Sequence, residues 1–200
     1  AGGTATFSVV LDSQPTADVT IGISSSDLTE GTVGTSSLTF TAGNWNVAQV
    51  VTVTGVDDFV DDGNIAYSII TAAASSGDGN YHGMNASDVA VTNNDNDTAG
   101  ITVSLISGPT TEAGGTATFS VVLDSQPTAD VTIGIASSDL TEGTVSTSSL
   151  TFTAGNWNVA QVVTVTGVDD WVDDGNIDYS LVTAAASSGD GNYHGMNASD

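Results

Sequence analysis

Apolar and polar residues alternate along most of the chain, and this period of two predicts β-strands rather than helices. The residues between the apolar positions are mostly Thr, Ser, Gly and Ala, which suit a solvated sheet face. The predicted inward faces are Ala5, Phe7, Val9 and Leu11 (residues 3–11); Val19, Ile21 and Ile23 (residues 18–23); Leu38 and Phe40; Val51 and Val53; Ile65, Tyr67 and Ile69; Val89 and Val91; and Ile101, Val103 and Leu105 (residues 100–106).

The whole pattern recurs after 112 residues, because residues 1–88 match residues 113–200 without insertion or deletion. A period of this length is too long for one turn of a solenoid and is typical of a complete sandwich domain. We therefore predict an all-β fold of tandem immunoglobulin-like antiparallel β-sandwiches with about seven strands each. The six substitutions between the copies are Ser24/Ala136, Gly34/Ser146, Phe59/Trp171, Ala66/Asp178, Ile69/Leu181 and Ile70/Val182.

The repeat phase predicts domains at residues 1–98, lacking a first strand, and residues 99–200, lacking a last strand. A segment like residues 101–106 is expected to replace the missing first strand of the first domain. Two interpretations remain open at this point. The chain is either a window of a longer tandem polypeptide, or a subunit that joins other copies head to tail by lending strands, which would build a filament.

Charge narrows the classes of partner. The chain has no Lys or Arg and 24 acidic residues, which gives a formal net charge of −24. Such a surface repels nucleic acid and anionic membrane, since phosphate binding needs basic side chains. There is no Cys and no apolar run of membrane-spanning length, so neither a disulfide nor membrane insertion is expected. The composition favours an extracellular or cell-surface protein.

An acidic cluster follows one predicted strand in each copy. Residues 57–62 hold four Asp, residues 169–174 hold four more, and Asp95 and Asp97 lie at the junction. Carboxylates this close repel one another, and no basic side chain relieves them. A hard cation is the expected partner, and Ca²⁺ accepts six to eight oxygen ligands in irregular geometry. The alternative is a solvated, solubilising run of charge.

Four motifs in order extend this picture: residues 111–119 (TEAGGTATF), 150–158 (LTFTAGNWN), 163–170 (VTVTGVDD) and 94–100 (NDNDTAG). With them each copy resembles the Calx-β domain and the related calcium-binding sandwich repeats of large bacterial surface adhesins. The resemblance implies Ca²⁺ ligands at one end of each sandwich. These are Asp57, Asp58, Asp61, Asp62, Asp95 and Asp97 in the first copy, and Glu112, Asp169, Asp170, Asp173 and Asp174 in the second.

Two departures from that family pattern affect the sites. The first copy's counterpart of Glu112 would precede Ala1, so that site is expected to be less complete in this chain. The family has a Glu-rich stretch where this sequence has Asp61-Asp62-Gly63-Asn64, so the number of ligands is expected to differ.

Other chemistry has weaker support. His82 and His194 stand without a paired nucleophile, so no enzymatic activity is predicted. Asp27 and Glu30 could form the acid pair of a glycoside hydrolase, but a turn or an additional calcium ligand is the favoured interpretation. Trp45 and Trp157 could stack on sugar, although packing over the core is favoured.

The sequence as a whole favours a structural extender or fibre-forming module of an extracellular repeat protein, stiffened by calcium. Its expected partners are further copies of the same repeat, head to tail. The alternatives are a carbohydrate-binding adhesive module and an accessory array of a secreted enzyme.

Overall fold

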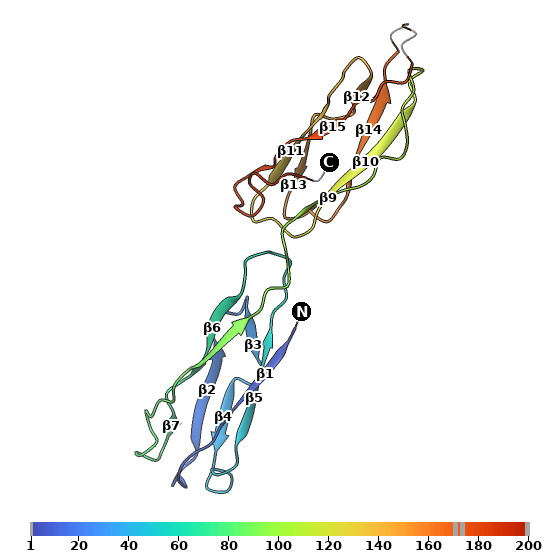
Figure 1. The fold of residues 1–200 in the computed structure, drawn as a ribbon. Coiled ribbons are helices and arrows are strands. Elements are labelled where there is room, and N and C mark those ends of the chain that lie inside the picture. Colours follow the sequence, from blue (N-terminus) through green and yellow to red (C-terminus); the bar gives the residue numbers. More distant parts are fainter. Residues whose placement is uncertain (1, 170–171, 173–174, 199–200) are drawn as a thin grey trace. The chain divides into compact units, whose positions relative to one another are not determined.

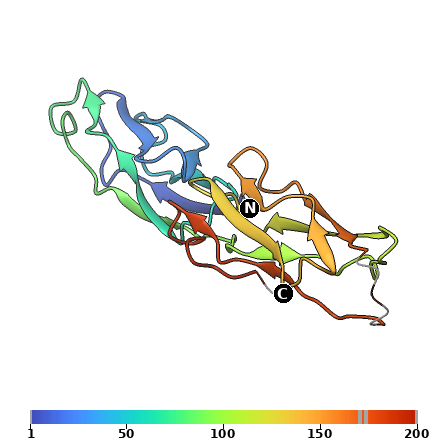
Figure 2. The same cartoon turned by 90° about the horizontal axis from the view of Figure 1, so that it is seen from above.

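The computed structural model describes residues 2–169, 172 and 175–198. The chain divides into two compact units. The first runs up to residue 58 and includes residues 62–96, and the second contains residues 59–61 and the chain from residue 97 onward. The described residues form strands and turns, with no coiled ribbon in either view (Figures 1 and 2). Consistent with this, they contain no helix that could span a membrane.

Two antiparallel sheets make up the first unit, in the orders β1-β5-β3 and β4-β2-β6-β8, with β7 beside β2. Their antiparallel registers confirm the predicted all-β fold class. The strands are β1 (Thr4–Val9), β2 (Val19–Ser25), β3 (Gly31–Val33), β4 (Ser37–Phe40), β5 (Gln49–Gly55), β6 (Ile65–Thr71), β7 (Ser75–Ser76) and β8 (Val89–Asn93).

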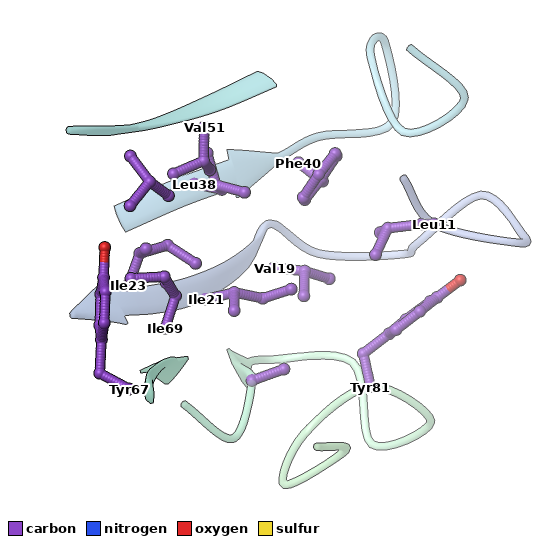
Figure 3. Packing of buried hydrophobic residues seen from close by; sticks show 12 residues of the cluster. Leu11, Val19, Ile21, Ile23, Leu38, Phe40, Val51, Tyr67, Ile69 and Tyr81 are labelled. Carbon is purple, nitrogen blue, oxygen red and sulfur yellow. The ribbon is translucent and has the colours of Figure 1, made fainter. Parts of the chain in front are cut away.

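The core of the first unit lies between these sheets, as expected for a sandwich. Val19, Ile21 and Ile23 alternate along β2 and are buried, whereas the residues between them are not. They pack in one cluster with residues of the opposite sheet such as Val51 and with Phe40 of β4 (Figure 3). The period-two pattern therefore identified the buried face of this strand correctly.

The second unit repeats this arrangement with sheets β12-β14-β10-β9 and β13-β11-β15, and with β16 beside β11. Here β9 adds a fourth strand to the first sheet by pairing with β10. The strands are β9 (Ile101–Val103), β10 (Thr116–Leu123), β11 (Val131–Ser137), β12 (Gly143–Val145), β13 (Ser149–Phe152), β14 (Gln161–Gly167), β15 (Leu181–Thr183) and β16 (Ser187–Ser188).

Some local features differ from the sequence prediction. The short strands β3 and β7, with their counterparts β12 and β16, were not anticipated, because two or three residues show no periodicity. The strand predicted over residues 100–106 ends at Val103. Leu105 was expected to share its inward face but is 94% exposed. Beyond Val103 the chain is no longer a strand, and it contacts the edge of β10 through separate hydrogen bonds from Ser104 N and Ser107 N.

Candidate metal centre

Three carboxylates from two separate segments converge in the first unit. Glu30 directly precedes β3, whereas Asp58 and Asp62 lie in the loop that follows β5. Each offers one oxygen, and these oxygens all lie within 4.8 Å of one another. Ligands bound to one Ca²⁺ at about 2.3–2.6 Å are at most about 5 Å apart. The three carboxylates are therefore close enough to share one cation.

Strand pairing creates this convergence. Strand β3 pairs with β5 so that Gly31 lies opposite Gly55. The next bond continues the ladder, because the Val56 N–H donates to the Glu30 carbonyl at 3.0 Å. Glu30 is thereby fixed beside the first residue of the acidic loop, although 28 positions separate Glu30 from Asp58 in the sequence.

Glu30 is a buried acid, with 8% of its surface exposed. Its side chain accepts a hydrogen bond from Asn93 Nδ2 at 3.3 Å. The same Asn93 nitrogen donates to the Val56 carbonyl at 2.7 Å. A neutral amide satisfies one lone pair of Glu30 but does not neutralise its charge, and burying a charge without a counter-charge is costly. The site therefore favours a cation next to Glu30.

The Tyr67 ring packs against Gly31, the residue after Glu30, and this packing requires glycine at position 31. A Cβ on Gly31 would come within 2.0 Å of the Tyr67 hydroxyl oxygen. Burial raises the pKa of Tyr67, and the charge of Glu30 raises it further. The same arrangement recurs in the second unit, where a Cβ on Gly143 would meet the Tyr179 hydroxyl at 2.3 Å.

The surroundings of Asp62 disfavour its ionised form. Desolvation raises the pKa of Asp62 above its ordinary value, and the charges of Asp58, Glu30 and Asp95 raise it further. A bound cation would reverse this effect, because opposite charge nearby favours the ionised carboxylate. The electrostatics of the site thus favour either a proton or a metal ion.

Asp95 shapes the acidic loop from the segment after β8. Its Oδ2 accepts a hydrogen bond from Gly63 N at 2.7 Å, and its own N–H donates to Asn64 Oδ1 at 2.9 Å. Gly63 has a φ of 76°, a left-handed conformation that glycine adopts without strain. Asp95 therefore lies near Asp62 and holds the turn that follows it.

The remaining predicted ligands of the first copy do not join the group of three. Asp57 lines a groove on the first unit, together with Gly55 and Asn93. Asp61 belongs to the second unit, where its Oδ2 accepts a hydrogen bond from Ala99 N at 2.8 Å. Asp97 is also part of the second unit.

The second unit repeats the backbone of the site. Gly143 pairs with Gly167, and the Val168 N–H donates to the Glu142 carbonyl at 3.0 Å. Asp169 follows Val168, whereas the predicted ligands Asp170, Asp173 and Asp174 lie outside the described residues. Glu112 is exposed and follows Thr111, whose main chain lies against Gly167.

Other acidic and aromatic candidates have structural roles. Asp27 Oδ1 accepts hydrogen bonds from Thr29 N at 2.9 Å and Thr29 Oγ1 at 2.6 Å. These bonds lower the pKa of Asp27, the opposite of what a general acid needs. Trp45 is partly buried and packs against the core.

The two histidines occupy matching turns. His82 Nδ1 accepts a hydrogen bond from Ser76 N at 3.5 Å, and His194 Nδ1 accepts one from Ser188 N at the same distance. Both imidazoles therefore contact the backbone of the two-residue strand that precedes their turn, β7 or β16.

Sequence reasoning left Glu30 out of its main ligand set, naming it only as an additional calcium ligand, and did not identify Asn93. One signal was present, since Glu30 is one of three Glu in the chain and its counterpart Glu142 is identical. What was missing was the pairing of β3 with β5, which brings Glu30 to the acidic loop.

No protein-family model matches the sequence, and no curated protein matches it either. Among solved structures, the chain is similar to CBD12 from CALX1.2, with a TM-score of 0.39 and 14% identity over 92% of this chain and 74% of the other. It is also similar to the calcium binding domain CBD12 of CALX1.1, with a TM-score of 0.40 and 16% identity over the same shares. These scores are too low to carry the family resemblance, so the sandwich architecture rests on the strand register described above.

Proposed function

We propose that this protein is a calcium-binding structural module that spaces or builds a surface assembly outside the cell. The convergence of Glu30, Asp58 and Asp62 within 4.8 Å supports the proposal most directly. The chain has no Lys or Arg to neutralise such a group. A cation from solution is therefore the partner that relieves both the mutual repulsion and the buried charge of Glu30.

Calcium suits this group better than the other common metals. All three ligands are carboxylate oxygens, and zinc sites are built mainly from Cys and His. Asp58 and Asp62 are exposed, which leaves room for water to complete a coordination shell. Magnesium demands near-ideal octahedral geometry, whereas calcium tolerates irregular loops.

The structural role is proposed from the repeat. Near-identical copies of a domain-sized unit add length to a protein, whereas an enzyme gains little from them. Calcium that ties the loop after β5 to the start of β3 would stiffen each unit. The partly buried Trp45 gives little support to a sugar-binding platform, so we retain the spacer role as the single proposal.

Calcium titration by isothermal calorimetry tests the metal site. The parent chain is expected to bind Ca²⁺ in the dissociation range of extracellular modules, roughly 10⁻⁴–10⁻³ M. The variant Asp58→Asn/Asp62→Asn should lose the ion of the first unit, because asparagine keeps the shape and removes both charges. Asp18→Asn/Asp130→Asn removes the same number of charges from exposed positions and should bind like the parent.

Equal binding by the parent and the Asp58/Asp62 variant would contradict the site. The location outside the cell needs a separate test in the source organism. Antibody against the chain should label intact cells or the medium, and labelling only after lysis would contradict the extracellular role.

A further inference from the structure

The two units differ at one edge of their first sheet, next to strand β1 in the first unit and strand β10 in the second. In the second unit, β9 pairs with β10, which places Thr102 opposite Val122. In the first unit, β1 is an end strand of its sheet in the described part of the chain. The buried residues reflect this difference, because Phe119 and Val121 of β10 are 5% and 0% exposed, whereas Phe7 and Val9 of β1 are only partly buried.

Residues 99–112 follow the edge of β10 through several backbone bonds. Ser104 N donates to Ser120 O and Ser107 N donates to Thr118 O, each at 2.9 Å. The return bonds run from Ser120 N to Ser104 Oγ and from Thr118 N to Ser107 Oγ, also at 2.9 Å. The edge of β10 is therefore satisfied by this segment.

The segment then closes over the end of the sheet. Thr110 Oγ1 lies 2.7 Å from the Tyr179 hydroxyl oxygen. The Thr111 main chain occupies the space above Gly167, where a Cβ would meet the Thr111 carbonyl oxygen at 2.1 Å. Apolar contacts add to these bonds, since Ile101 and Val103 pack against the core of the second unit.

Each contacted position has an identical residue in the first unit. Ser120 and Thr118 correspond to Ser8 and Thr6, and Tyr179 and Gly167 correspond to Tyr67 and Gly55. At the matching place the first unit has a groove of about 340 Å³, lined by Gly55, Tyr67 and Ala5 among others. The β1 edge that matches the bound edge of β10 is thus present in the first unit, whereas the place above Gly55 is taken by Asn93, whose Oδ1 would lie 2.6 Å from a Cβ there.

We propose that the β1 edge of the first unit binds a strand segment with the sequence of residues 99–112, contributed by another repeat of the same kind. The chain's own segment is already bound to β10, so the occupant of β1 is a further copy of that sequence. Binding adds a strand antiparallel to β1, as β9 does beside β10 in the second unit. This is β-strand addition, in which backbone bonds give affinity and side-chain pockets give specificity. It does not depend on calcium.

A labelled synthetic peptide of residues 99–112 tests the proposal by fluorescence anisotropy, with chelator present to remove any effect of metal. We expect saturable binding of one peptide per chain. The variant Ser8→Pro should weaken binding about tenfold or more, because it removes an edge N–H and the bond it makes. An edge strand tolerates proline where its N–H faces outward, and circular dichroism checks that the fold is retained. A peptide with Ile101→Asp and Val103→Asp is the matched control and should not bind.

A fusion protein provides a second test, which does not require a separate peptide to bind the chain. Residues 99–112 are placed directly before Ala1, which recreates the junction that residues 112 and 113 already form. The amides of Thr6 and Ser8 should then exchange with deuterium about tenfold or more slowly than in the parent. The Ser120 amide serves as an internal reference. The proposal is overturned if these amides exchange as fast as in the parent, or if the altered peptide or the Ser8→Pro variant binds like the originals.

Discussion

Val56 donates its backbone N–H to the carbonyl oxygen of Glu30 at 3.0 Å, and this bond carries the β3–β5 ladder one step past the end of both strands. It places a buried carboxylate at the start of an acidic loop that is distant in the sequence. The same bond joins Val168 to Glu142 in the second unit. The candidate metal centre is therefore built on the sheet, and changes at its three carboxylates should affect stability and calcium binding together.

Calcium should raise the melting temperature of the chain relative to chelator. A ligand that binds only the folded state adds about 2.7 kcal/mol per site at a hundredfold excess over its dissociation constant. Differential scanning calorimetry in Ca²⁺ and in chelator measures the difference. Identical melting curves would contradict a site that couples calcium to folding.

Glu30→Gln should change the stability of the protein in opposite directions with and without calcium. In chelator the variant should be as stable as the parent or more stable, because it removes a buried charge that faces Asp58 and Asp62. With calcium it should bind about tenfold or more weakly, since one charged ligand is lost. Melting curves in both buffers measure the effects. A variant that is destabilised equally in both would show that Glu30 acts only through packing.

Asp62 should make the metal-free protein less stable as the pH rises. Its pKa is raised in the folded state, so the folded state binds more protons than the unfolded state near the ordinary value of about 3.9. The stability it contributes is full below that value and is lost as the pH rises through the folded pKa. The pKa values of Asp27 and Asp78 are lowered, so these two groups change stability with pH in the opposite direction. They do so equally in the parent and in Asp62→Asn, and comparing the two proteins in chelator therefore isolates the effect of Asp62. Parallel pH profiles would contradict the assignment.

Gly31→Ala should destabilise the first unit by about 1–3 kcal/mol, as overpacking in a core typically does. The added Cβ would meet Tyr67 ring and hydroxyl atoms at 2.0–2.7 Å, and an aromatic ring cannot move away cheaply. Gly79→Ala is the control, because nothing lies within 4 Å of its Cβ and its φ is not positive. Denaturant unfolding measures both variants. If Gly31→Ala is as stable as the parent, the prediction is wrong and Tyr67 repacks without cost.

Local pattern was sufficient to predict the strands of the core. Val19, Ile21 and Ile23 alternate with polar or small residues, and the structure buries all three. The pattern failed where the chain leaves the sheet. Leu105 continues the alternation of Ile101 and Val103 but points to solvent, because the strand ends before it. Periodicity reports which face an apolar residue would take, not where pairing stops.

The sequence by itself determined the all-β class, the repeat of 112 residues and an excess of acid with no base to balance it, because each of these is a property of residue order and composition. Only the tertiary structure decided which acids meet. Asp58 and Asp62 are close in sequence, but Glu30 joins them through the three-residue strand β3, and Asn93 joins through the end of β8. Pairing between distant segments depends on backbone hydrogen bonds that any residue except proline can donate, so side-chain pattern does not encode the partner of so short a strand.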